Sequence, residues 1–155
     1  MLLPPTVDDT WVGLVDGPVP VPDAQAWATT PDCGAVVTFA GTVRDHADGR
    51  TGVTSLTYEA YEEHAAARMA AVVADARTRW PAIRRVAVLH RVGTLQVTEV
   101  AVVVTVASPH RPEALAAAGF VIDTVKATVP IWKRETWADG DAWVEGDALT
   151  SESLA

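Results

Sequence analysis

The sequence predicts an α+β fold in which three helices pack on a sheet of mixed or antiparallel strands. Its 155 residues are the size of one ordinary domain, so we expect a single domain over 1–155, with flexible ends at 1–8 and 146–155. At 49% hydrophobic residues the chain can form a substantial core. The expected order of elements is β-α-β-β-α-β-β-α-β-β. Because helices do not alternate strictly with strands in this order, an α+β sheet is favoured over a doubly wound parallel sheet.

The strands are predicted from short segments rich in β-branched and apolar residues. We expect them over 11–15, 34–43, 54–61, 84–95, 99–108, 131–137 and 142–145. The segment 99–108 is apolar throughout, which indicates a central strand buried on both faces. The polar, turn-rich stretch 44–52 is expected to be a mobile loop.

The helices are expected over 22–30, 62–80 and 109–129. In 62–80 the apolar residues recur at helical spacing, and Pro81 follows the last turn. In 109–129 Pro112 lies in the first turn, where a missing N–H costs nothing, and Pro130 ends the helix.

Composition and charge exclude several classes of function. The formal net charge is −8, whereas general nucleic-acid binding needs a basic surface. A single cysteine, Cys33, rules out an internal disulfide framework and a multi-cysteine zinc site, and it fits a reducing cytosol. The N-terminus has no basic region before an apolar run, so it is not expected to be a signal peptide. The apolar stretches are of strand length, too short to span a bilayer.

The two lysines are the first candidates for chemistry. The twelve basic residues divide into ten arginines and two lysines. The two lysines are seven residues apart: Lys133 lies in the segment TVPIWKRE, and Lys126 lies just before it. Pro130 breaks the helix between them, so Lys133 can lie beside Lys126. Two amines placed together lower each other's pKa and attract an anion. A lysine near a helix C-terminus also favours the helix dipole, which accounts for Lys126 but not for Lys133.

Two further basic motifs predict anion binding. In SPHRP, His110 and Arg111 lie at the start of the third helix, where free backbone N–H groups bind anions. In FAGTVRDH, Gly41 permits close approach of the backbone at a strand end and Arg44 follows it. Arg111 and Lys126 are 15 residues apart, about 22 Å along a helix at ~1.5 Å per residue. There are therefore two sites, or one pocket that draws its two ends from different subunits of a homodimer.

Other residues are weaker candidates. Cys33 lies in a turn-like DCG and is interpreted as structural. Glu62, Glu63 and His64 lack the two-histidine helical spacing of a zinc protease, and we predict no metal site and no cofactor. His90 lies inside an apolar strand, a position more typical of a satisfied buried histidine than of a ligand-binding one.

These motifs together resemble the large, catalytic subunit of molybdopterin synthase. The resemblance runs from about Asp9 to Glu145. It rests on GAVVTFAGTVRDH, LTYEAYEEHA, RWP, HRVGTL, SPHRPEA and VKATVPIWKRE followed by WVE, which occur in the order and spacing of that family. It implies an α/β hammerhead fold with an additional antiparallel β subdomain.

The resemblance also implies a function. The protein would be a cytoplasmic sulfurtransferase of molybdenum-cofactor biosynthesis, converting cyclic pyranopterin monophosphate to molybdopterin. The sulfur donor would be the C-terminal thiocarboxylate of a small ubiquitin-like partner subunit. A homodimer of the large subunit would form the core of a heterotetramer, with a site shared between its two chains.

The resemblance implies a set of site residues as well. The catalytic residues would be Lys126 and Lys133. The substrate-binding residues would be Thr42, Val43, Arg44, His110, Arg111, Lys126, Lys133, Arg134 and Glu135. Two other readings remain open at this point: a non-catalytic, anion-binding dimeric subunit, and an enzyme that forms a Schiff base between a lysine and a phosphorylated carbonyl compound.

Overall fold

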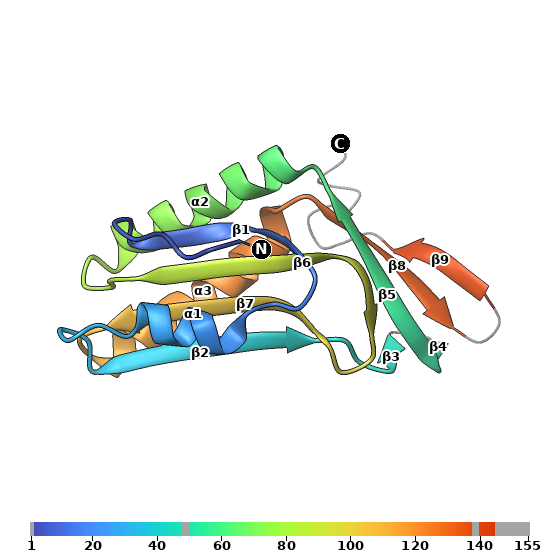
Figure 1. Ribbon diagram of the computed structural model, residues 1–155, viewed down its shortest axis with the longest axis horizontal. Coiled ribbons are helices and arrows are strands. Elements are labelled where there is room, and N and C mark those ends of the chain that lie inside the picture. The colour runs from blue at the N-terminus through green and yellow to red at the C-terminus, as the bar shows by residue number, and fades with distance from the viewer. Residues whose placement is uncertain (1, 48–49, 138–139, 145–155) are drawn as a thin grey trace.

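The computed structural model describes residues 2–47, 50–137 and 140–144 (Figure 1). Within these ranges the chain forms three helices and a main sheet of seven strands, with a short two-stranded ribbon beside it. The elements are β1 (Thr10–Asp16), α1 (Val21–Ala28), β2 (Ala35–Thr42), β3 (His46–Ala47), β4 (Arg50–Thr51), β5 (Val53–Ala60), α2 (Glu62–Arg79), β6 (Val86–Gln96), β7 (Val100–Ser108), α3 (Arg111–Thr128), β8 (Ile131–Trp137) and β9 (Gly140–Val144).

The main sheet has the order β2-β7-β6-β5-β8-β9, and β1 pairs parallel with β6 while every other pairing is antiparallel. Strand β6 belongs to both halves of this sheet. Its first part, Val86–Val92, pairs with β1, and its last four residues, from Gly93 to Gln96, pair with β5. Gly93 has φ +94°, a conformation that residues with a side chain rarely adopt. The sheet therefore bends at Gly93, and β5, β8 and β9 extend away from the rest (Figure 1).

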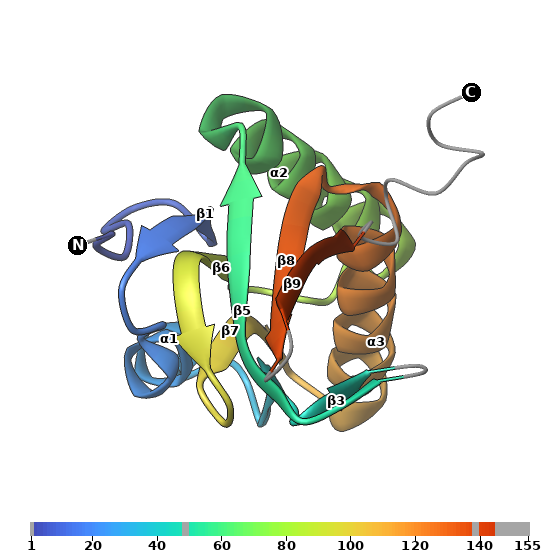
Figure 2. The ribbon, with the colours of Figure 1, turned by 90° about the vertical axis from the view of Figure 1, so that its right-hand side faces the viewer.

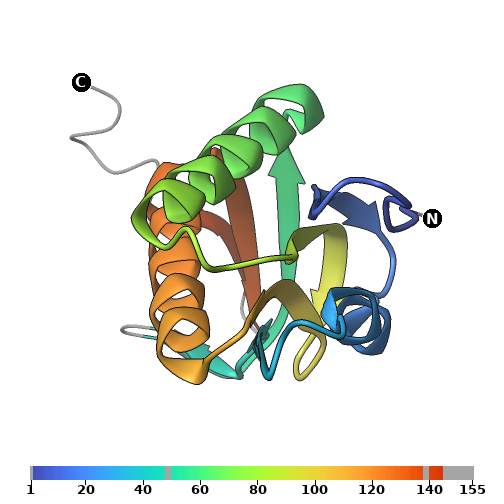
Figure 3. The ribbon, with the colours of Figure 1, turned by 90° about the vertical axis from the view of Figure 1, so that its left-hand side faces the viewer.

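The helices cover the two faces of the sheet unequally. α2 and α3 pack against each other on one face, and α1 lies on the other (Figures 2 and 3). The larger hydrophobic core lies between α2, α3 and the even-numbered residues of β6 and β7, such as Val86, Val88, Val104 and Val106. A smaller core under α1 contains odd-numbered residues of the same strands. β7 is consequently buried on both faces, as its sequence predicts.

The α+β class and the order of the main elements are confirmed. The prediction of a simple loop over 44–52 is wrong in part, because β3 and β4 form an antiparallel ribbon there; positions 48–49 lie outside the described residues. The expected flexibility of 146–155 also concerns positions outside them. At the other end Leu2 packs against the α1 core and the Pro5 carbonyl accepts a hydrogen bond from Trp27. Among the described helices none is long and apolar enough to cross a membrane.

Candidate active site: a lysine pocket at the end of α3

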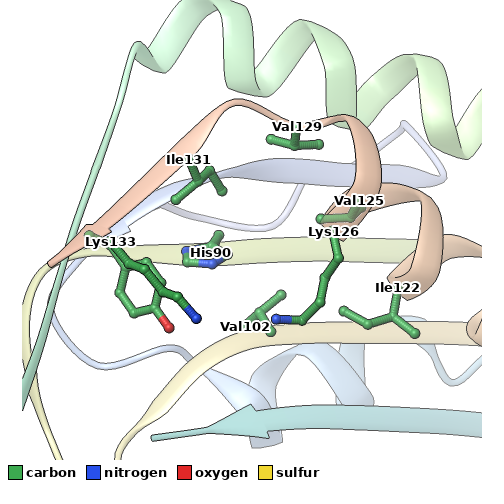
Figure 4. Close-up of a pocket in the computed structure, with 9 residues that line it drawn as sticks. His90, Val102, Ile122, Val125, Lys126, Val129, Ile131 and Lys133 are labelled. Carbon is green, nitrogen blue, oxygen red and sulfur yellow. The ribbon is translucent and has the colours of Figure 1, made fainter. Parts of the chain in front are cut away.

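The two lysines of the chain line one pocket. It lies where α3 ends and β8 begins, over His90 of β6 and Val102 of β7, and Lys126 and Lys133 both point into it (Figure 4). Lys126 comes from the last turn of α3, whose final N–H bond runs from Val129 to the Val125 carbonyl. Pro130 then ends the helix. The chain turns directly into β8, and Lys133 is the third residue of that strand.

Much of the pocket wall is apolar. This part is formed by Val102 of β7, by residues of α3 and by the segment that links α3 to β8. The apolar lining residues are Val102, Ile122, Val125, Val129 and Ile131. Charges act more strongly in such surroundings than in bulk water, so two ammonium groups here form an effective anion site. The cavity volume of about 70 Å³ is several times the ~10–15 Å³ that one water needs, so the pocket has room for water.

Tyr58 and His90 complete the pocket, and neither was predicted as a site residue. Their rings meet edge to face with centroids 4.9 Å apart. Burial, with a smaller contribution from the charge of Glu135, raises the pKa of Tyr58 to about 12. Burial lowers the pKa of His90 to about 4, and the charge of Lys126 acts in the same direction while a backbone hydrogen bond opposes it. At neutral pH both rings are therefore uncharged. The sequence does contain a hint of this position. His90 is two residues after Val88 and four after Val86, and because side chains alternate along a strand, all three lie on the face of β6 that α3 covers.

The predicted residues Thr42, Val43 and Arg44, at and just after the end of β2, lie at the same end of the sheet as the lysines. Thr42 pairs with Val100, and Gly41 pairs with the pocket residue Val102. The side chain of Arg44 is exposed. Val43, in contrast, is only 3% exposed, and its N–H and C=O bond to Glu99 and Thr98. The structure thus leaves Arg44 available to a ligand but places the Val43 side chain in a small core cluster.

His110 and Arg111 lie at the opposite end of α3 from Lys126. His110 precedes the first helical residue, Arg111, and both side chains are exposed. The helix separates Arg111 from Lys126 by about 22 Å, at ~1.5 Å per residue. Within one chain, therefore, these two residues do not reach the lysine pocket.

Arg134 and Glu135 project from opposite faces of β8, because side chains alternate along a strand. Glu135 shares the face of Lys133, lies opposite Leu56 and is 3% exposed. Arg134 lies on the other face, where its guanidinium stacks 5.4 Å from the ring centroid of Trp143. Glu135 thus influences the pocket through its charge on Tyr58, whereas Arg134 faces away from it.

The described residues contain no group of three or more histidine, cysteine, aspartate or glutamate side chains that could hold a metal ion. The chemistry available in the pocket is that of two amines, a neutral imidazole and a neutral phenol. Such a set binds an anion, stabilises negative charge that develops during a reaction and transfers protons.

Comparison with known proteins decides the family. A family profile described as "MoaE protein" matches residues 14–128 of the chain. The chain belongs to the MoaE family. A molybdopterin synthase catalytic subunit from Nostoc sp. is 42% identical over 143 residues, covering 92% of this chain and 86% of the relative. A catalytic subunit of the same name from Taeniopygia guttata is 42% identical over 125 residues, covering 81% of this chain and 80% of the relative.

Solved structures of MoaE-family proteins have the same fold. Molybdopterin synthase from Staphylococcus aureus superposes with a TM-score of 0.80 at 35% identity, covering 85% of this chain and 95% of the other. The MoaE protein from Burkholderia ambifaria superposes with a TM-score of 0.77 at 31% identity, covering 94% of this chain and 95% of the other.

Proposed function

We propose that this MoaE-family chain is the catalytic subunit of a molybdopterin synthase, which converts cyclic pyranopterin monophosphate to molybdopterin by sulfur transfer. The observation that carries the proposal is the convergence of the only two lysines, Lys126 and Lys133, on one apolar-walled pocket. The relatives that match most of the chain are named molybdopterin synthase catalytic subunits. A cyclic phosphate substrate is an anion, and so is a thiocarboxylate, so both suit a pair of ammonium groups.

In this proposal the lysines serve the two charge-generating steps. A thiocarboxylate sulfur attacks a substrate carbon and forms a C–S bond while a C–O bond to that carbon breaks, and the oxygen leaves with the phosphate where the cyclic phosphate opens. Water then hydrolyses the resulting thioester to leave sulfur on the substrate and a carboxylate on the donor. Opening of the cyclic phosphate frees a phosphate oxygen that needs a proton. Lys126 and Lys133 stabilise the negative charge in these steps and act as general acid or base.

The sulfur donor is proposed to be a small ubiquitin-like partner with a thiocarboxylated C-terminus. A small pocket whose apolar wall is interrupted only by the two amines, Tyr58 and His90 suits the end of an extended peptide. A solved protein–protein complex of subunits 1 and 2 of the molybdopterin-converting factor from Helicobacter pylori contains a chain with this fold, with a TM-score of 0.72 at 18% identity. Lys126, on the exposed last turn of α3, is the lysine we assign to the donor tail.

The substrate site is proposed to be shared between two copies of the chain. Arg44 and Thr42 lie at the lysine end of the sheet, whereas His110 and Arg111 lie at the far end of α3. A homodimer that brings His110 and Arg111 of one copy to the lysines of the other would complete an anion clamp. With a small partner at each end, the assembly would be a heterotetramer, working in the cytoplasm. Thr42, Val43, Arg134 and Glu135 remain predicted substrate contacts.

Reconstitution tests the proposal. The purified chain is mixed with the thiocarboxylated small partner and cyclic pyranopterin monophosphate, and molybdopterin is measured after oxidation to a fluorescent derivative. We expect product that depends on the thiocarboxylate and is absent with the carboxylate form of the partner. Binding of the partner without any product would refute sulfur transfer. Trapping of a substrate on Lys126 or Lys133 by borohydride would favour the Schiff-base enzyme instead.

A further inference from the structure

His90 presents to the lysine pocket one hydrogen-bond acceptor without a protein partner among the described residues. Its side chain is 8% exposed, and Nδ1 lies 2.8 Å from the Arg91 carbonyl oxygen. A carbonyl oxygen only accepts hydrogen bonds, so Nδ1 carries the ring proton. In the neutral ring Nε2 then holds a lone pair and no hydrogen. No hydrogen bond to Nε2 is found among the described residues, and His90 lines the pocket.

The ring stays in this acceptor form at neutral pH. Burial lowers the pKa of His90 to about 4, the Arg91 hydrogen bond opposes that change, and the positive charge of Lys126 adds to it. The titratable groups around the ring are Tyr58 from β5, Lys126 from α3 and Lys133 from β8. Tyr58 is protonated, because its pKa is raised to about 12. The acceptor therefore lies in a cavity whose other polar groups are two amines and a phenol.

An anion alone does not satisfy this arrangement. The lysines attract negative charge, but a negative oxygen or sulfur beside Nε2 would meet a lone pair. An acceptor that loses its water without gaining a donor is destabilised, so a ligand that displaces the pocket water binds best when it supplies an N–H at this point. The pocket therefore matches a ligand that carries an anionic group and an N–H donor close to each other.

We propose that His90 is a binding residue that accepts a hydrogen bond from an N–H of the ligand whose anionic group is held by Lys126 and Lys133. The inference rests on the proposed function, in which two ligands have this chemistry. The last peptide N–H of the donor tail belongs to the same residue as its thiocarboxylate, and a reduced pterin carries several ring N–H groups. Both are recognised by the same lone pair, and the experiments below distinguish them.

The direct test uses the wild-type protein with ¹⁵N-labelled histidine. The Nε2 resonance of His90 is followed by NMR while the thiocarboxylated partner, or the cyclic precursor, is added separately. We expect the Nε2 signal to move to lower frequency with one of the two ligands and Nδ1 to remain protonated. Calorimetry on the same samples confirms binding. A ligand-saturated protein in which neither ligand moves the Nε2 signal would overturn the inference.

Two variants test the consequence for turnover. His90→Phe keeps an aromatic ring but has no acceptor, and His90→Gln places an amide oxygen close to the position of Nε2. We expect His90→Phe to raise KM for one ligand about ten-fold, the effect of one lost hydrogen bond, with little change in kcat. His90→Gln should recover most of that loss. If KM rises equally for both ligands, and the rise in each variant parallels its drop in melting temperature, the role of His90 is purely structural and the inference is refuted.

The outcomes separate this inference from the proposed function. If the wild-type chain makes molybdopterin and Nε2 does not respond, the inference fails and the function stands. If the chain binds the partner, with the Nε2 response, but makes no product, the function fails and the binding role stands. A wild-type chain that binds neither ligand would overturn both.

Discussion

Tyr58 on β5 and Lys133 on β8 are direct cross-strand partners, so their side chains leave the sheet on the same face. The next pair on that face is Leu56 with Glu135. The neighbouring residue Arg134 faces the other side, against Trp143. The pairing register of β5 with β8 therefore directs the Lys133 side chain into the pocket. A shift of this register by one residue would place the Arg134 side chain there instead.

Replacement of Lys133 by alanine should abolish most of the activity. Loss of a charge-stabilising donor from a preorganised site lowers kcat by about 10²–10³-fold. Lys133→Arg should recover little, because a guanidinium is larger and does not release a proton near neutral pH. The measurement is the rate of molybdopterin formation at saturating partner and precursor. Arg68→Ala, which removes an exposed positive charge from α2, is the matched control and should keep wild-type activity. Comparable rates for Lys133→Ala and the control would contradict the role.

A site shared between two chains predicts complementation between inactive variants. Arg111→Ala and Lys126→Ala should each have little activity alone. In a mixed dimer one of the two sites combines the intact Lys126 of one chain with the intact Arg111 of the other. Random exchange of subunits should therefore restore about a quarter of wild-type activity. The variants are mixed under mildly denaturing conditions, refolded together and assayed for product. If the mixture stays inactive although mixed dimers have formed, the two residues do not share a site across the dimer.

The sequence predicts the main elements well because each carries a local signal. Periodic apolar residues mark 62–80, and prolines bracket α3, so the separation of Arg111 from Lys126 follows from the helix alone. The meeting of Lys133 with Tyr58 depends on the pairing of β5 with β8, segments more than 70 positions apart. No local pattern specifies such a pairing, which is why Tyr58 was missed.

His90 shows a second limit of reading a sequence. A histidine in an apolar strand is usually satisfied, and its Nδ1 is indeed bonded to a neighbouring carbonyl. The free Nε2 becomes visible only when α3 and β8 are in place and leave a cavity above β6. The β3–β4 ribbon was missed for a different reason, since strands of two residues carry no periodic signal.

A methyl group added at Gly41 should disturb the pocket wall. A Cβ at this position would lie 2.7 Å from Cγ1 of Val102, which lines the pocket beside Lys126. We expect Gly41→Ala to lower the free energy of unfolding by about 1–3 kcal/mol through overpacking, and to lower activity. Gly119→Ala is the control, because no atom lies within 4 Å of its added Cβ and alanine favours a helix by about 0.5–1 kcal/mol. Urea unfolding of both variants measures the difference, and equal stabilities would contradict the close contact with Val102.

Burial of neutral His90 makes stability depend on pH in a defined direction. Its pKa in the folded protein is about 4, below the ordinary value of 6.5, so the unfolded chain takes up the proton first as the pH falls. Stability from this group is fully present above about pH 6.5 and is lost as the pH falls towards 4. The full difference in pKa between the unfolded and the folded chain corresponds to a loss of roughly 3 kcal/mol in the free energy of unfolding. Urea unfolding at pH 7 and at pH 4.5 measures this loss. The same measurement on His90→Gln gives the part of the loss that comes from protonation of carboxylates, which is then subtracted. The variant should lose clearly less stability between the two pH values than the wild type; an equal loss would show that His90 is not the group that titrates.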